Sequence, residues 1–401
     1  MAASKNRCTE LESIIVISKE TMKHNWEVCR IGHFCDVKTG KLDANASCEN
    51  GLYPFFTCSK EALRINSFSY NCECVLIAGN GDLNVKYYNG KFNAYQRTYI
   101  ITVKPKFEDI ISVEYLYNFF RLYISTLREK SVGGIIKFIK LGDITNAVIN
   151  VPPIKVQKII VSELNKINET IEDCRELLRN LDALAQSLFY DTFGDPVKNP
   201  KKWPIKQLKA LSSLITNGTT PKGGQAVYVD SGITFFRSQN VWRNRLVMDD
   251  VAYLDEATNA TMRGSMLHHN DILITKTGRI NTENSSLGRS ALFTGEDNTA
   301  NINGHVYLVR LERTINPRFV LAILLTDSYR DLIRRVCVGA IDKRQLNLSH
   351  IEQFPIILPP LSLQEQFAAR IEQIEVQKKA VEQTIAELQT LLDSRMDYWF
   401  N

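Results

Sequence analysis

The chain carries VPPIKVQKI at residues 151–159 and a near copy, LPPLSLQEQ, at residues 358–366. Both stretches read Pro-Pro-x-x-x-Gln and stand directly before a long helical pattern. Proline is well tolerated in the first turn of a helix, because the N–H that it lacks would have no partner there. The recurrence of this signal at an offset of 207 residues predicts that the chain is a tandem repeat.

The repeat extends in both directions from the two proline pairs. Downstream, the same offset aligns Leu164 with Ile371, Ile167 with Ile374, Leu181 with Leu388 and Phe193 with Phe400. Upstream, VGGI at 132–135 resembles VGAI at 338–341, CVLIAGNG at 74–81 resembles DILITKTG at 271–278, and Trp26 parallels Trp203. Each half is therefore predicted to hold a strand-rich region that leads through Pro-Pro into a helix.

Apolar residues recur every 3.5 residues after each proline pair, which is typical of a coiled-coil seam. The two expected seams comprise Ile160, Leu164, Ile167, Ile171, Leu178 and Leu181, and Phe367, Ile371, Ile374, Val381, Ile385 and Leu388. Lys378 and Arg395 interrupt the second seam. The pattern of ~29 residues corresponds to a rod of ~43 Å, and Gly194 and Pro196 predict that the first rod ends at Phe193. We expect the rods to pair antiparallel; two unrelated helices, each packed on its own domain, are the alternative.

The regions before the helices predict mixed domains. NVKYYNGKFNAYQRTYIITV at 84–103 is β-branched and aromatic, and apolar helical stretches follow at 113–127 and 319–333. We therefore predict an α+β fold of two α/β domains, each followed by a long helix, the two helices pairing as an antiparallel coiled coil. The expected parts are an N-terminal extension at 1–20, a first domain at 21–153, a central helix at 154–193, a second domain at 194–358 and a C-terminal helix at 359–401.

Charge is segregated along the chain. The net charge of +5 divides into basic regions at 21–155 (+5) and 196–360 (+7) and acidic regions at 156–195 (−4) and 361–401 (−3). This distribution suits a polyanion-binding surface joined to protein-binding elements, although solvated surfaces often look similar. No run of about 18 apolar residues could span a bilayer, and the nine cysteines lack paired spacing. These features predict a cytoplasmic protein with reduced thiols and no membrane association.

The sequence lacks recognisable catalytic motifs. GHFCDVKTGK at 32–41 and AGNGD at 78–82 lack the glycine spacing of phosphate-binding loops. Zinc-protease, nucleophile-elbow and metal-ligand patterns are absent, and the histidines have no partner at ligand spacing. Both Pro-Pro pairs also lack the Asn/Asp before them and the aromatic after them that an adenine methyltransferase would carry. We expect a non-catalytic chain with no metal and no cofactor of its own.

Several segments mix Arg and Lys with amides, threonines and aromatics, such as RSQNVWRNR at 237–245 and TKTGRINTENSSLGR at 275–289. Basic side chains attract phosphates, whereas Asn, Gln and Arg can discriminate bases. An ordinary polar surface is the alternative for any single segment. The expected DNA contacts are Lys86, Asn93, Tyr95, Arg97, Arg237, Asn240, Lys276, Thr277, Arg279, Arg289, Asn303, His305, Arg344 and Gln345.

The chain repeats one pattern twice: a variable region that begins near a Trp, then Pro-Pro-x-x-x-Gln, then a heptad helix. This pattern resembles the specificity (S) subunits of type I restriction–modification systems. The resemblance covers residues 24–401 and is most specific in the helices. It implies that each target-recognition domain reads one half of a split double-stranded DNA site and that the helices space the domains. It further implies docking of two methyltransferase subunits, which use S-adenosylmethionine to methylate adenine N6. Restriction subunits would add ATP-driven translocation and cleavage.

The expected rod length agrees with this implication, since ~43 Å spans about 12–13 base pairs at ~3.4 Å per pair, on the order of one helical turn. Residues 1–20 have no counterpart in the second half. Two other classes of function stay open at this point: a stand-alone nucleic-acid-binding scaffold without a methyltransferase partner, and a modifying enzyme whose motifs have diverged.

Overall fold

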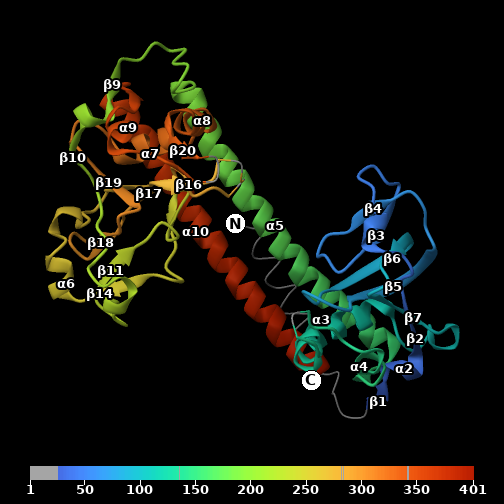
Figure 1. Ribbon diagram of the computed structural model, residues 1–401. Coiled ribbons are helices and arrows are strands. Elements are labelled where there is room, and N and C mark those ends of the chain that lie inside the picture. The colour runs from blue at the N-terminus through green and yellow to red at the C-terminus, as the bar shows by residue number, and fades with distance from the viewer. Residues whose placement is uncertain (1–25, 135, 281, 283, 341–342) are drawn as a thin grey trace. The chain divides into compact units, whose positions relative to one another are not determined.

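The computed structural model describes residues 26–134, 136–280, 282, 284–340 and 343–401 (Figure 1). The chain divides into two compact units: the first takes the chain up to Glu176 together with Glu382–Asn401, and the second is Leu177–Val381. Each unit therefore contains one strand-rich region and a part of each long helix. The predicted N-terminal extension, residues 1–20, lies outside the described residues.

The first unit is built on a six-stranded sheet in the order β2-β7-β5-β6-β3-β4, with α3 packed on β5 and β6. A separate pair, β1 and β8, brings the two ends of the strand-rich region together. Its elements are β1 Glu27–Arg30, α2 Ile31–Phe34, β2 Cys35–Thr39, β3 Tyr53–Phe56, β4 Leu63–Ile65, β5 Tyr70–Ala78, β6 Val85–Ala94, β7 Thr98–Val103, α3 Val113–Lys130, α4 Leu141–Thr145 and β8 Val148–Val151.

The second unit uses smaller sheets in the orders β10-β19-β15-β17, β14-β11-β18 and β16-β21-β20, together with the pairs β12-β13 and β22-β9. Its strands are β9 Ile205–Gln207, β10 Ser212–Asn217, β11 Ile233–Phe236, β12 Val241–Trp242, β13 Arg245–Leu246, β14 Ala252–Leu254, β15 Ile272–Thr275, β16 Thr277–Gly278, β17 Ser290–Leu292, β18 Ala300–Ile302, β19 Val306–Leu311, β20 Val338–Ala340, β21 Lys343–Gln345 and β22 Pro355–Ile357. Its helices are α6 Glu256–Ala260, α7 Pro317–Leu325, α8 Asp327–Val336 and α9 Leu348–Glu352.

The two units repeat the same strand pairings. In each, one antiparallel pair closes the strand-rich region, β1 with β8 in the first and β9 with β22 in the second. In each, a parallel pair matches a phenylalanine to an asparagine, Phe55 to Asn93 and Phe235 to Asn301. The predicted tandem repeat is therefore a repeat of backbone architecture as well as of sequence.

Two long helices carry the heptad patterns, and the predicted fold class is confirmed. Helix α5 is Ile154–Phe193 and helix α10 is Leu361–Phe400, each of 40 residues and therefore ~60 Å long (Figure 1). Gly194 takes a φ of 77° directly after α5, and its N–H donates to the Tyr190 carbonyl. This left-handed position, which favours glycine, ends the helix where the sequence predicts.

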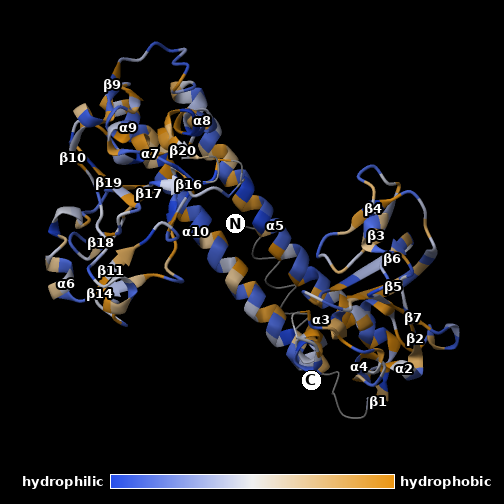
Figure 2. Ribbon diagram, in the orientation of Figure 1, coloured by the Kyte–Doolittle hydropathy of each residue, from blue (hydrophilic) through white to orange (hydrophobic). Residues whose placement is uncertain are grey.

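Contacts inside each unit give the pairing of α5 and α10 its direction. In the first unit, Glu163 near the start of α5 bonds Arg395 and Trp399 near the end of α10. In the second unit, Phe193 at the end of α5 meets Phe367 near the start of α10, with ring centroids 5.2 Å apart. The helices are therefore antiparallel, and Figure 2 shows hydrophobic and hydrophilic residues alternating along both of them.

The predicted seam positions lie on the inward side of each helix. Ile160, Leu164, Ile167, Ile171, Leu181, Phe367 and Ile374 are buried, and Leu178, Ile371, Val381, Ile385 and Leu388 are half-buried. The two residues that interrupt the pattern form ion pairs with the opposite helix: Lys378 with Asp182 in the second unit and Arg395 with Glu163 in the first.

The Pro-Pro-x-x-x-Gln joint has the same hydrogen-bond geometry in both units. Gln157 is fully buried; its side-chain oxygen accepts from the Ser112 N–H at 2.9 Å and its amide donates to the Pro152 carbonyl at 2.8 Å. Gln364 accepts from the Asn316 N–H at 3.0 Å and donates to the Pro359 carbonyl at 2.9 Å. Ser112 and Asn316 are the N-caps of α3 and α7. The glutamine therefore fastens each long helix to the helix of its own domain.

The described residues lack two further features. Within the described ranges, no helix combines the length and the apolar character that a membrane span needs. The same residues contain no group of three or more His, Cys, Asp or Glu side chains placed to hold a metal ion. The eight cysteines in this part of the chain are free thiols.

Candidate nucleic-acid interface

A cluster of loops at corresponding places in both units contains most of the expected DNA contacts. In the first unit the chain after β5 bridges at Asn80 to Phe138, which also bridges to Val132. In the second unit β16 pairs with β21, and β21 pairs with β20. The Ile139 N–H donates to the Gly79 carbonyl at 3.0 Å, and the Leu346 N–H donates to the Lys276 carbonyl at 2.9 Å. The same loop frame is thus found in both units: Gly79 bonds Ile139 in the first, and Lys276 bonds Leu346 in the second.

The frame places predicted residues from the two halves at equivalent positions. The Arg97 carbonyl accepts from the Gly79 N–H at 2.8 Å, and the His305 carbonyl accepts from the Lys276 N–H at 2.9 Å. A tyrosine hydroxyl fixes the frame in each unit: the half-buried Tyr99 donates to the Ile139 carbonyl and the buried Tyr307 to the Leu346 carbonyl, both at 3.0 Å. Arg97 and His305 are both exposed, so each unit presents a different side chain from the same location.

A second pair of predicted residues is equivalent in the same way. The Tyr95 N–H donates to the Phe56 carbonyl at 2.9 Å, and the Asn303 N–H donates to the Phe236 carbonyl at 3.0 Å. Tyr95 and Asn303 are both half-buried. An aromatic ring in one unit therefore stands where an amide stands in the other.

Five further candidates of the second unit gather around one three-stranded sheet, β16-β21-β20. Thr277 lies on β16, Arg344 and Gln345 lie on β21, and Lys276 and Arg279 flank β16. Arg279 is exposed and the other four are half-buried. The Lys276 ammonium lies 5.8 Å from the centre of the Tyr307 ring. These five residues remain candidates for DNA contact.

Three predicted residues are buried, and their polar atoms bond to the protein itself. Asn240 is 1% exposed and closes a turn, accepting from the Arg237 N–H and donating to the Val247 and Asp250 carbonyls. Asn93 is 2% exposed and its oxygen accepts from the Ala94 N–H. This geometry favours a structural role for both over contact with DNA.

Arg289 has the same character, because its guanidinium donates to the Ser285 carbonyl and lies 3.9 Å from the centre of the Trp242 ring. Burial and the nearby Arg243 lower the pKa of Arg289. The sequence pattern could not separate these side chains from surface ones, since polar residues of turns and of binding loops have the same composition.

Lys86 and Arg237 are partly engaged inside their own units. The Lys86 ammonium donates to the Ser59 carbonyl at 2.7 Å, and burial lowers the pKa of Lys86. Arg237 pairs with Asp250 at 3.1 Å and lies 5.8 Å from the centre of the Tyr228 ring. Lys86 and Arg237 can contact a ligand only if these intramolecular contacts break.

An open hollow of about 300 Å³ adjoins the sheet β16-β21-β20. Its lining is polar and basic, with Thr277, Gly278, Arg279, Thr282, Asn284, Ser285, Ser286 and Lys343. Hydroxyls, an amide and basic groups are the side chains that contact base edges and phosphates. Asn284 and Lys343 were not singled out from the sequence, although both lie in or beside segments rich in Arg, Lys and amides.

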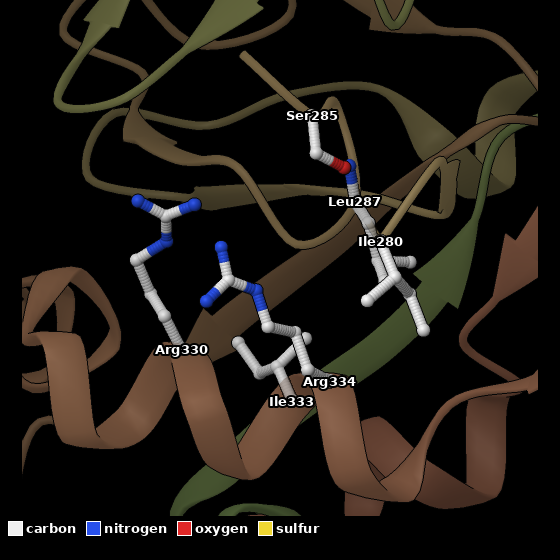
Figure 3. A pocket seen from close by; sticks show the side chains of 6 residues that line it. All are labelled: Ile280, Ser285, Leu287, Arg330, Ile333 and Arg334. Carbon is white, nitrogen blue, oxygen red and sulfur yellow. The ribbon is translucent and has the colours of Figure 1, made fainter. Parts of the chain in front are cut away.

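A narrow pocket beside this hollow has arginines on one wall. Arg330 and Arg334 extend from α8 toward the segment that carries Ile280, Ser285 and Leu287 (Figure 3). Ser285 lines both cavities. Sequence reasoning missed this wall, because α8 reads as an ordinary amphipathic helix with arginines on its polar face.

Comparison with known proteins identifies a family domain in the first part of the chain. Residues 23–180 match the type I restriction modification DNA specificity domain. These residues belong to that family. The chain is 37% identical over 162 residues to the type I restriction enzyme EcoDI specificity subunit of Escherichia coli, which covers 40% of this chain and 35% of that protein. The resemblance predicted from the sequence is thus confirmed for residues 23–180.

A second relative is more distant. The putative type I restriction enzyme MjaX specificity subunit of Methanocaldococcus jannaschii is 23% identical over 170 residues, or 42% of this chain and 38% of that protein. Both alignments therefore span little more than a third of the relatives' length.

Solved structures extend the likeness of fold beyond the specificity domain at 23–180. The S subunit of a type I restriction–modification system from M. genitalium matches with a TM-score of 0.60 at 14% identity, covering 95% of this chain and 98% of that one. A chain from a structure of complex assembly and conformational transition in the type I system matches with a TM-score of 0.51 at 17% identity, covering 94% and 98%. The fold of this chain, two α/β domains each followed by a long helix, is thus the fold of these two solved chains.

Proposed function

We propose that this chain is the DNA-recognition subunit of a type I restriction–modification complex and that each unit reads one half of a split double-stranded DNA site. The observation that carries the proposal is the doubled loop frame. Gly79 and Lys276 hold it with matching backbone bonds, while Arg97 and His305 differ at the same position. A common frame with different side chains suits two readers that approach DNA alike and select different bases.

Base reading is assigned to the residues that remain accessible on this frame. In the first unit these are Tyr95 and Arg97; in the second they are Thr277, Arg279, Asn303, His305, Arg344 and Gln345. Lys276, Lys343 and Lys86 can add phosphate contacts that position the protein without reading sequence. The net charges of the strand-rich regions support this division, since both are basic.

The long helices are proposed to dock protein partners. Their sequences are net acidic, which disfavours contact with DNA. Leu177 and Leu184 on α5 are 45% and 53% exposed and lie seven residues apart, on one face of the helix. We expect two methyltransferase subunits to bind the helices, with restriction subunits completing the complex.

In this proposal the chain contributes recognition and its partners contribute chemistry. S-adenosylmethionine and ATP are expected on the partner subunits, with adenine N6 as the methylated atom. The complex would act in the cytoplasm, where its DNA substrate and both cosubstrates are found.

Genome-wide mapping of N6-methyladenine tests the proposal. The chain is co-expressed with the methyltransferase subunit encoded beside it, and the subunit expressed alone is the control. A split motif that appears only when both chains are present is the expected result. A continuous motif would refute reading by two units. DNA binding without any dependence of methylation on this chain would favour a stand-alone scaffold, and methylation by this chain alone would make it an enzyme.

A further inference from the structure

Two arginines of the second unit, Arg330 and Arg334, line one pocket, and further arginines lie near enough to act on them or on each other. Arg330 and Arg334 lie one turn apart on α8, and the charges of Arg243 and Arg334 act on Arg330. Arg243 also acts on Arg289. Neighbouring guanidinium charges repel one another, and partial burial strengthens this repulsion. Such a cluster is stabilised when an anion occupies it.

The pKa of Arg330 reflects this environment. Burial, followed by the charges of Arg243 and Arg334, lowers that pKa to about 10, and Asp327 and Asp331 offset the effect only in part. Arg334 has a carboxylate partner, Asp331 at 3.0 Å, but this pair is well exposed and contributes little stability. Among the residues that the structure describes, none forms a hydrogen bond or an ion pair with the Arg330 guanidinium.

The pocket in front of these guanidiniums has the character of an anion site. Its opposite wall carries the Ser285 hydroxyl, whereas Ile280, Leu287 and Ile333 close the remaining sides (Figure 3). The space is narrow, about 10 Å³, which is enough for one water-sized group. A phosphate oxygen has this size, and arginine recognises phosphate through its planar fork of donors.

The position of the pocket identifies the source of the phosphate. The hollow lined by Thr277, Arg279, Asn284 and Lys343 adjoins it and shares Ser285 with it. A DNA strand whose base edges face the hollow carries a phosphate every few ångströms along its backbone. An acidic protein surface would also satisfy the arginines, but the hollow beside them has the amide and hydroxyl lining that suits base edges.

We propose that Arg330 and Arg334, together with Ser285, bind one phosphate of the DNA backbone and thereby position the second unit on its half-site. This inference rests on the proposed function, and it adds a contact from a helix that the sequence pattern did not indicate. The contact carries no base information, so it sets affinity and register, while the hollow next to it selects the sequence.

Salt-dependent DNA binding by the full chain tests the site. The probes are a 30-base-pair duplex of arbitrary sequence and one that carries the methylated motif, and the variants are Arg330→Ala and Arg334→Ala. Each variant should weaken binding to both duplexes equally, on the order of tenfold at low salt, and should reduce the slope of log K against log salt by about one. Arg335→Ala, exposed on the same helix and outside the pocket, is the matched control and should match the unmodified chain. Arg330→Lys, which keeps the charge, should recover part of the affinity.

Three outcomes would overturn the assignment. If Arg330→Ala and Arg334→Ala keep the slope of the unmodified chain while their thermal unfolding is unchanged, the arginines do not bind a phosphate. If they lose methyltransferase binding instead of DNA binding, the pocket serves an acidic protein surface. If the unmodified chain binds neither duplex, alone or with its methyltransferase subunit, the proposed function fails first and this inference fails with it.

Discussion

At the scale of the residue, one glutamine in each half fixes the joint between domain and helix. Gln157 and Gln364 are both buried and satisfy an N-cap N–H that would otherwise have no partner. The proline carbonyls that accept from them are held close by the short Pro-Pro-x-x-x-Gln spacing. The two prolines therefore act in the helix start, and the glutamine is the reason that the motif recurs as a unit.

Replacing this glutamine should destabilise its unit. Gln364→Ala leaves the half-buried Asn316 N–H and the buried Pro359 carbonyl without partners, which we expect to cost about 2–4 kcal/mol. Gln377→Ala, at an exposed position of the same helix, should stay within about 0.5 kcal/mol of the unmodified chain. Urea unfolding followed by tryptophan fluorescence measures both variants, and equal midpoints would show that the glutamine bonds contribute nothing.

At the scale of the element, α5 and α10 are held together by two different kinds of ion pair. Glu163 is 7% exposed on its side chain and receives bonds from Arg395 and from the Trp399 indole at 3.0 Å. Asp182 is 65% exposed where it meets Lys378. Breaking a buried pair leaves an uncompensated charge, whereas a surface pair is already well solvated.

The two pairs should therefore respond differently to truncation. Arg395→Ala should lower the stability of the first unit by about 3–5 kcal/mol, and Lys378→Ala should lower that of the second by at most about 1 kcal/mol. Hydrogen exchange of α5 amides, read separately near Glu163 and near Asp182, measures each effect locally. Comparable loss of protection at both places would contradict the difference in burial.

The sequence predicts the elements better than the side-chain roles. The heptad period and Gly194 are enough to predict helix α5 and its last residue, because helix periodicity and helix ends are local signals. Asn240 and Arg289 read as surface groups, but the fold buries them, since burial depends on residues far along the chain. Arg330 joins Ser285 only through tertiary structure, so no sequence pattern could place it at the interface.

At the scale of the whole molecule, the repeat supports the proposal that the two halves of the chain are separate readers on one pair of helices. The loop frame is common, and the side chains on it differ between Arg97 and His305 and between Tyr95 and Asn303. Each reader should therefore be changeable without altering the other, because substitutions that share no partners act independently.

The length of the helices should set the gap between the two half-sites. Inserting seven residues, one heptad, into both α5 and α10 keeps the seam in phase and lengthens each helix by ~10 Å, or about three base pairs. We expect both half-sequences to be kept and the gap to grow by about that amount, as read from the methylated motif. An unchanged gap would show that the helices do not determine the spacing.

The most direct test of two independent readers maps the methylated motif genome-wide for two single variants. Each variant is expressed together with the methyltransferase subunit. Arg97→Ala should relax base preference in one half of the motif, and Arg279→Ala should relax it in the other half only. Lys206→Ala, an exposed basic residue on β9, is the control and should keep the full motif. Relaxation of the same half by both arginine variants, or of both halves by either one, would contradict the account.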